Sequence, residues 1–369
     1  MKLPFETNTL KKTDPLIFFA VVPLLIMGVL FIESADGPAR ASKQLMWIGV
    51  GLGVFAAVAS YDYLKLLKAS SVLYVITLLS LVALLMLPPM VKGNSARSWF
   101  RIRGFSIQPS ELMKIFVVLV MAHYLMYRRN YRRMLGLVVP FLLALVPMVL
   151  VLKQPDLGSA VIFVPIAFAM LYVAAARLKH LLAVVGMGLG VSFYGWFYVL
   201  SPYQKMRIES WQNPEKFLGR EAYQLLASLM SIGTGCVTGK GRGSGIMSKV
   251  VPENHTDFIF SVIAEEWGFI GSMFLLACFF LLLVAGVGIA LRTREPAGRL
   301  IAAGIVALFA AEIIINLYVA MGFFPTTGIA LPFVSYGGSS MVSSFFALGL
   351  LANVGAKQYP VFADDDFSG

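Results

Sequence analysis

Ten long apolar stretches dominate this 369-residue chain and restrict it to folds that can exist inside a lipid bilayer. They cover roughly residues 15–32, 44–60, 70–88, 110–127, 134–152, 157–175, 178–200, 259–291, 300–321 and 335–355. Because a bilayer core is about 30 Å thick, a helix needs about 20 mostly apolar residues to cross it. The chain is 59% hydrophobic and only 13% charged, too little polar sequence to cover a water-soluble domain. The sequence therefore predicts an all-α polytopic membrane protein that forms one integral membrane domain over residues 1–369.

The apolar stretch 259–291 is longer than one straight crossing requires, so its first turns are expected to lie outside the hydrocarbon. Lys and Arg predict the orientation of the chain. With a cytoplasmic N-terminus, the inner segments carry about twice as many of these residues as the short outer loops. Ten spans then leave both termini in the cytoplasm. The net charge of +11 follows from this topology, and nucleic acid is not expected as a partner.

One long polar segment, residues 201–258, separates the seventh apolar stretch from the eighth. The orientation above makes it a large extracytoplasmic loop, and long loops of this kind usually carry function. Within it, Glu221–Ile232 has apolar residues at helical spacing, which predicts a short helix lying at the membrane interface.

A glycine-rich run at 233–245 lies in the same loop. It fits no nucleotide-binding pattern, since Lys240 is followed by Gly241 rather than by Ser or Thr. Lys240 and Arg242 instead indicate a mobile basic loop that holds a phosphate-bearing ligand or covers a cleft.

Ionisable residues at the edge of a membrane are costly and are therefore candidates for function. The first is Glu111, in the sequence Gln-Pro-Ser-Glu that opens the fourth apolar stretch. An acid there also suits the positive end of the helix dipole, so a purely structural role stays open. Lys114 lies one turn further on and is expected to pair with Glu111.

Lys153 and Asp156 lie in the short connection between the fifth and sixth apolar stretches. One interpretation is a capped helix reversal held by an acid–base pair. The other is a charged pair that lines a cavity within the membrane protein.

The long loop closes with His255, Thr256 and Asp257, just before the eighth apolar stretch. Thr256 or Asp257 can cap the following helix, but a cap needs only one polar residue. A partly desolvated Asp at the mouth of a membrane protein can instead act as a general base. Asp257 is therefore the candidate catalytic residue, and His255 and Thr256 are candidates for contacting the substrate.

The tenth apolar stretch opens with Ser335, Tyr336, Gly337 and Gly338. Small residues allow close packing of helices. The alternative is that Ser335, Gly337 and Gly338 present polar groups to an anionic ligand. Elsewhere, Glu312 is unusual because it lies within an apolar stretch, and Asn316, one turn away, is expected to hydrogen-bond it.

Four of these motifs, at 108–111, 154–158, 252–260 and 335–339, occur in an order and spacing typical of one bacterial family. The chain resembles the SEDS family (shape, elongation, division and sporulation) over nearly its whole length. Members are peptidoglycan glycosyltransferases, which polymerise lipid II at the outer face of the cytoplasmic (inner) membrane and release undecaprenyl diphosphate. The resemblance implies the SEDS fold and this activity. The stretch 260–268 is more similar to the elongation branch than to the division branch, which implies a role in cell elongation and shape maintenance.

The resemblance also implies roles for individual residues and partners. Asp257 would be the catalytic acidic residue, while Glu111, Lys153 and Asp156 would line the central cavity. The loop glycines 239, 241, 243 and 245 would flank a lipid-binding groove. The implied partners are lipid II, the elongation machinery and a class B penicillin-binding protein, which adds transpeptidase activity.

Glycosyl transfer from a lipid diphosphate needs a base near the acceptor hydroxyl and positive charge near the leaving group. Asp257 is expected to supply the base. Lys153, nearby Arg residues or a divalent cation such as Mg²⁺ or Mn²⁺ would supply the positive charge.

Two other functions stay open at this point. A transporter that moves lipid II between leaflets would place its site near the midplane, where Glu312 and His123 are expected to lie. Most of the acids in the membrane cluster instead at the outer edge, which favours chemistry outside. A scaffold that only recruits a transpeptidase would leave the polar motif at 252–260 without a purpose.

Overall fold

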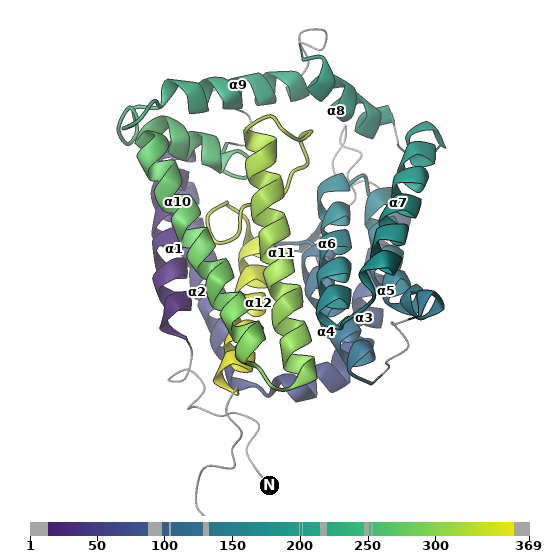
Figure 1. Ribbon diagram of the computed structural model, residues 1–369. Coiled ribbons are helices and arrows are strands. Elements are labelled where there is room, and N and C mark those ends of the chain that lie inside the picture. The colour runs from purple at the N-terminus through teal and green to yellow at the C-terminus, as the bar shows by residue number, and fades with distance from the viewer. Residues whose placement is uncertain are drawn as a thin grey trace, which may run out of the picture.

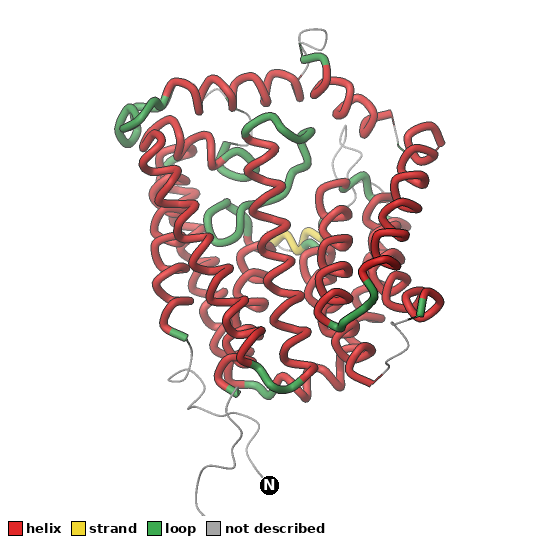
Figure 2. Tube along the Cα trace, viewed as in Figure 1, coloured by secondary structure: helices red, strands yellow, loops and turns green. Residues whose placement is uncertain are grey.

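Long helices run side by side and form a bundle, as the sequence predicts (Figures 1 and 2). The computed structural model describes residues 14–87, 98–102, 105–127, 133–198, 200, 202–214, 220–246, 251 and 254–357. The bundle helices in these ranges are α1 (Pro15–Asp36), α2 (Pro38–Ser60), α3 (Tyr63–Met86), α4 (Pro109–Tyr127), α5 (Val138–Lys153, preceded by the 3-10 turn η3, Met134–Leu137), α6 (Leu157–Val173), α7 (Leu178–Tyr198), α10 (Ile259–Arg292), α11 (Pro296–Ala320) and α12 (Gly338–Ala356). Within the described ranges, eight helical segments are long and apolar enough to span a membrane, and α6 and α7 add shorter apolar stretches. The predicted all-α, multi-pass class is therefore confirmed.

Proline and aspartate set the first residues of many of these helices. Proline stands at the start of α1, α2, α4 and α11, where its missing N–H leaves no helical hydrogen bond unmade. Asp14, Asp62 and Asp156 cap α1, α3 and α6, each accepting a hydrogen bond from a backbone N–H of the first turn. α2 and α3 begin ahead of their predicted starts at 44 and 70, because hydropathy marks only the part of a helix that lies in hydrocarbon.

Several short elements gather at one end of the bundle, the upper end in Figure 1. α8 (Pro202–Gln212) and α9 (Arg220–Thr234) lie across this end, and the segment 321–337 dips from it into the bundle (Figure 1). α9 confirms the predicted short helix at 221–232. α8 and the antiparallel pair β1 (Phe100–Ile102) and β2 (Phe105–Ile107) were not expected from the sequence.

α10 is broken at Gly268, whose φ of 63° and ψ of −156° lie outside the helical region. Its first part lies across the end of the bundle and its second part runs along it (Figure 1). This confirms that the stretch does not form one straight crossing. A break inside a helix leaves neighbouring carbonyl and N–H groups without helical partners.

The glycine-rich run supplies these missing partners. Two N–H groups of the run donate to carbonyls before the break, and the N–H groups of Phe269 and Ile270 donate to carbonyls of the run, all at 2.9–3.1 Å. A Cβ on Gly239 would lie 2.1 Å from the Glu266 carbonyl oxygen, and one on Gly268 would lie 2.3 Å from the Gly239 nitrogen. Both positions need glycine because two backbones are in direct contact.

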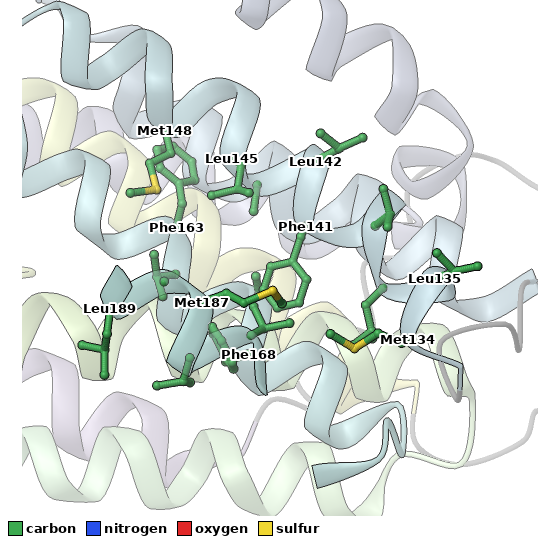
Figure 3. A pocket seen from close by; sticks show the side chains of 18 residues that line it. Met134, Leu135, Phe141, Leu142, Leu145, Met148, Phe163, Phe168, Met187 and Leu189 are labelled. Atoms are coloured by element: carbon green, nitrogen blue, oxygen red, sulfur yellow. The ribbon is translucent and has the colours of Figure 1, made fainter. Parts of the chain in front are cut away.

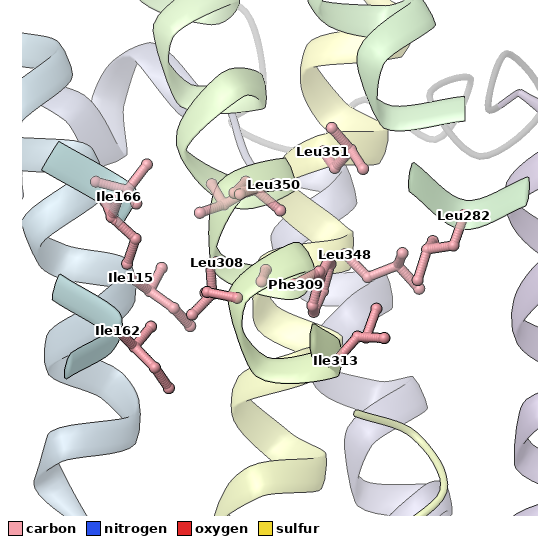
Figure 4. Close-up of a cluster of buried hydrophobic side chains, with 14 of the residues drawn as sticks. Ile115, Ile162, Ile166, Leu282, Leu308, Phe309, Ile313, Leu348, Leu350 and Leu351 are labelled. Carbon is pink, nitrogen blue, oxygen red and sulfur yellow. The ribbon is translucent and has the colours of Figure 1, made fainter. Parts of the chain in front are cut away.

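The centre of the bundle is formed by α4, α11 and α12, whose membrane-crossing windows are the most buried. Figure 4 shows Leu308 of α11 beside Ile115 of α4, and Phe309 of α11 beside Leu348 of α12. Polar side chains on these three helices therefore face protein rather than lipid, which is the only inexpensive place for them.

A cavity of about 630 Å³ lies between α5, α6 and α7 (Figure 3). Its lining is apolar throughout and includes Phe141, Met148, Phe163, Phe168 and Met187. It therefore offers hydrocarbon contact and no group for acid–base chemistry.

The contact at the α10 break can be tested with one methyl group. Gly268→Ala should lower the stability of the protein in detergent by about 1–3 kcal/mol, because it combines a positive φ with a backbone clash. Gly190→Ala is the matched control, since a Cβ there meets nothing within 4 Å and α7 is helical. Thermal unfolding of both variants checks the prediction, and equal melting temperatures would contradict it.

Candidate active site

The turn at 254–258, immediately before α10, is held by three consecutive carbonyl groups. The His255 carbonyl accepts from the Tyr336 N–H at 2.9 Å. The Thr256 carbonyl accepts from Ser335 Oγ at 2.6 Å, and the Asp257 carbonyl accepts from Asn316 Nδ2 at 2.9 Å. The turn is therefore fixed in place by α11 and by the residues that precede α12.

The serine of this arrangement is itself held from two sides. Ser335 Oγ accepts from the Leu331 N–H at 2.8 Å, and the Ser335 carbonyl accepts from Gln44 Nε2 of α2 at 3.1 Å. The motif at 335–338 thus supports the turn at 254–258. Gly338 has a packing role, because a Cβ there would lie 2.4 Å from the Trp47 ring. Gly337 precedes α12 as its N-cap residue.

Asp257 is half-buried on this turn. The N-cap residue of α10 is Phe258, so neither Thr256 nor Asp257 occupies the capping position that the sequence left open. The Asp257 carboxylate faces Gly328, where an added Cβ would lie 3.5 Å from Oδ2. Glycine at 328, with a φ of 76°, leaves space beside the carboxylate that any other residue would reduce.

His255 joins the turn to the connection between α1 and α2. The Arg40 guanidinium contacts His255 Nε2, and Asn254 Oδ1 and Asp36 Oδ2 lie 3.3 Å and 3.5 Å from Nδ1. Because a guanidinium can only donate, Nε2 accepts and the ring proton lies on Nδ1. Arg40 also pairs with Asp36 at 2.5 Å and lies 5.7 Å from the centre of the Tyr336 ring. A partly exposed cation thus lies next to the turn that carries Asp257.

A second group of charges lies inside the bundle. Lys114 is 2% exposed, and its Nζ pairs with Glu111 at 2.7 Å and with Glu312 of α11 at 2.5 Å. Ser343 of α12 donates to the other oxygen of Glu111 at 2.9 Å. The predicted pairing of Lys114 with Glu111 is confirmed. The predicted bond between Asn316 and Glu312 is wrong, because Asn316 donates to backbone carbonyls and Glu312 turns to Lys114.

Asp156 lies in the connection before α6 and faces the start of α4. Its Oδ1 accepts from the Ser159 N–H at 3.0 Å and its Oδ2 accepts from Gln108 Nε2 at 2.9 Å. Burial raises the pKa of the Asp156 carboxyl, and the Ser159 hydrogen bonds oppose that rise. The cap of the predicted helix reversal is therefore present, but Asp156 is held by Ser159 and Gln108 and not by the predicted acid–base pair.

Lys153 does not join Asp156. The side chain of Lys153 is exposed at the end of α5, and none of the ion pairs among the described residues links it to Asp156. The role of Lys153 at a cavity stays a prediction. Two residues after Asp156, the backbone of Gly158 packs against the segment that faces Asp257, since a Cβ on Gly158 would lie 2.5 Å from the Thr327 carbonyl oxygen.

The two basic residues of the glycine-rich run have partners within the protein. Lys240 pairs with the fully buried Glu265 at 2.7 Å, and Arg242 pairs with Glu33 of α1 at 2.5 Å. The run is thus docked on α10 and α1, whereas the sequence suggested a mobile loop. Its partners are distant in the sequence, and no local pattern indicates them.

Sequence reasoning missed Arg40 and Gln44 as residues that build the site, and it gave Asn316 the wrong partner. Gln44 and Asn316 are buried polar side chains at the edge of or within apolar stretches. Such residues are costly in a membrane, which is the signal that would have marked them.

Among the described residues, no three His, Cys, Asp or Glu side chains gather closely enough to hold a metal ion. A divalent cation at the leaving diphosphate stays a prediction.

Together, the helical bundle and the half-buried Asp257 at one end of it define a multi-pass membrane protein with an ionisable side chain held at that end. Residues 14–359 match the family model of the cell cycle proteins FtsW, RodA and SpoVE. The chain belongs to this family, the SEDS proteins.

Individual relatives agree with the family assignment. A probable peptidoglycan glycosyltransferase FtsW of Trichlorobacter lovleyi is 35% identical, with 99% of this chain and 98% of the relative covered. A solved structure described as showing coordinated polymerisation and crosslinking by a peptidoglycan synthase complex has a TM-score of 0.81 at 30% identity, covering 94% and 98% of the two chains. A mutant of RodA from Thermus thermophilus has a TM-score of 0.73 at 29% identity, covering 94% and 99%.

The buried ion pairs lead to a stability prediction. Lys114→Met should destabilise the protein by about 3–5 kcal/mol, because two buried carboxylates lose their shared counter-charge. The same substitution at the exposed Lys153 should change stability by less than about 0.5 kcal/mol. Thermal unfolding in detergent checks both, and a small effect at Lys114 would show that its charge is not needed for the fold.

Proposed function

We propose that the chain is a peptidoglycan glycosyltransferase that polymerises lipid II into glycan strands, with Asp257 as general base. The observation that carries the proposal is the half-buried Asp257 carboxylate on a turn whose three carbonyls are all held. A general base must be fixed in position and partly desolvated while staying open to its substrate. The names of the relatives support the same activity.

The reaction can be written around this residue. An acceptor sugar hydroxyl attacks the anomeric carbon of a donor sugar, and its proton passes to the Asp257 carboxylate. The bond between the anomeric carbon and the lipid diphosphate breaks, and undecaprenyl diphosphate leaves with the electron pair. Arg40, whose side chain is 41% exposed and contacts His255, would stabilise the diphosphate.

The location and partners follow from the same proposal. The end of the bundle that carries α8, α9 and the Asp257 turn would face outward from the bacterial cytoplasmic membrane, with both termini inside. The solved relative that coordinates polymerisation with crosslinking supports a class B penicillin-binding protein as partner. Lipid II and the elongation machinery complete the proposed set.

The branch of the family is the finer part of the proposal. The motif at 260–268 favours cell elongation, and the solved RodA structure agrees with it in fold. Most of the similar relatives carry the name FtsW, which favours division. We propose elongation on the basis of the 260–268 motif, and division is the alternative that an experiment in cells would distinguish from it.

Transport of lipid II between leaflets is the second candidate function. Its support is the buried charge group of Lys114, Glu111 and Glu312 inside the bundle. These three side chains satisfy one another, however, and Ser343 closes the group on the α12 side. Such a saturated group fits a structural role better than a path for a substrate.

A polymerisation assay tests the proposed base directly. Asp257→Asn should lower the rate of glycan-strand formation from lipid II by about 10²–10⁴-fold while leaving the protein folded, because it removes only the proton acceptor. Asp62→Asn is the matched control, since Asp62 caps α3 and pairs with Lys357 at the opposite end of the bundle. Both purified variants would be assayed with the class B partner. Wild-type rates in the Asp257 variant would refute the assignment.

Complementation separates the two branches of the family. Expressed in a rod-shaped bacterium depleted of its elongation polymerase, the chain should restore rod shape, because its 260–268 motif is more similar to the elongation branch than to the division branch. In a strain depleted of its division polymerase it should leave the cells filamentous. Microscopy of both strains provides the measurement, and the reverse pattern would assign the chain to division.

A further inference from the structure

Asn316 of α11 connects the candidate base to the segment that faces it. It is 1% exposed, and its Nδ2 donates to the Asp257 carbonyl at 2.9 Å and to the Ile329 carbonyl at 2.7 Å. An amide nitrogen carries two N–H bonds, so both donors of Asn316 are used. One side chain thus binds the turn on one side and the segment 321–337 on the other.

The two segments joined by Asn316 are the ones that define the surroundings of the carboxylate. Gly328 precedes Ile329 directly, and an added Cβ on Gly328 would lie 3.5 Å from Asp257 Oδ2. A bond at the Ile329 carbonyl therefore sets how close the Gly328 backbone lies to the carboxylate. The bond at the Asp257 carbonyl fixes the backbone from which the Asp257 carboxylate extends.

The three carbonyl bonds of the turn differ in where their donors come from. The donors to His255 and Thr256 belong to the irregular segment before α12. The donor to Asp257 lies inside the long helix α11, whose Glu312, one turn earlier, is held by Lys114. The hydrogen bond from Asn316 to Asp257 is therefore the one that attaches the turn to a helix at the centre of the bundle.

We propose that Asn316 is a positioning residue for glycosyl transfer, which fixes Asp257 against Gly328 through its two carbonyl bonds. It does not touch the substrate in this account and acts only through Asp257. The inference rests on the proposed function of Asp257. It goes beyond that function by assigning a residue on another helix to set the geometry of the base.

Asn353 offers a matched control within the same chain. It is also 1% exposed, and its Nδ2 lies 2.6–3.1 Å from the carbonyl oxygens of Val58, Ala59 and Tyr61, so that two of these carbonyls share one N–H. It joins α12 to the last turn of α2 and the residue after it, at the opposite end of the bundle from the Asp257 turn (Figure 1). Removing either amide leaves buried carbonyls without donors, so the structural cost is of the same kind.

The experiment compares Asn316→Leu with Asn353→Leu, both purified with the class B partner and assayed on lipid II. Both should lower the melting temperature. Below that temperature, Asn316→Leu should lower kcat at least tenfold with KM for lipid II changed less than twofold, while Asn353→Leu should keep kcat within twofold of wild type. Asn316→Ser, which keeps one donor, should give an intermediate kcat and guards against poor folding of the leucine variant.

The outcomes separate the two levels of the account. Wild-type kcat in folded Asn316→Leu, or an equal loss in Asn353→Leu, would overturn the positioning role. A rise in KM at constant kcat would also overturn it, because it would place Asn316 in substrate binding. Asp257→Asn, run in parallel, tests the proposed base separately. Wild-type kcat in that variant would mean that the base itself is wrongly assigned.

Discussion

A turn of irregular backbone can exist inside a membrane-embedded bundle only if its polar groups find partners without water. The turn at 254–258 meets this requirement through donors from Asn316, Ser335 and Tyr336, one for each of three consecutive carbonyls. The break in α10 meets it through the glycine-rich run. The inward path of the segment 321–337 and the docking of that run both follow from this single constraint.

The charges of the protein fall into two kinds with different consequences. Lys114 pairs with two carboxylates, Glu111 and Glu312, so its charge contributes to the stability of the fold. Asp257 is held through its backbone, and its carboxylate faces a glycine. Fixing the main chain while leaving space at the side chain is how a scaffold prepares a reactive group. α11 contributes to both arrangements, through Glu312 and Asn316.

The bundle could be predicted from the sequence because the bilayer thickness fixes how long an apolar helix must be. The helix α9 and the pair Glu111–Lys114 were also predictable, since both depend on helical spacing within one short segment. Asn316 was assigned to Glu312, its nearest polar neighbour on the same helix, whereas its partners come from two other segments. α8 could not be predicted because it lacks a helical period of apolar residues. The partners of Lys240 and Arg242 could not be predicted because they depend on how helices that are distant in the sequence pack together.

The central claim is that this bundle performs glycosyl transfer at the end that carries α8, α9 and Asp257. The most direct measurement uses vesicles that contain the protein in one known orientation, with its class B partner, and lipid II in one leaflet only. The account predicts glycan strands when lipid II is in the leaflet next to the α9 end, and none when it is in the other leaflet. Movement of lipid II between leaflets without strand formation would contradict it and would identify a transporter.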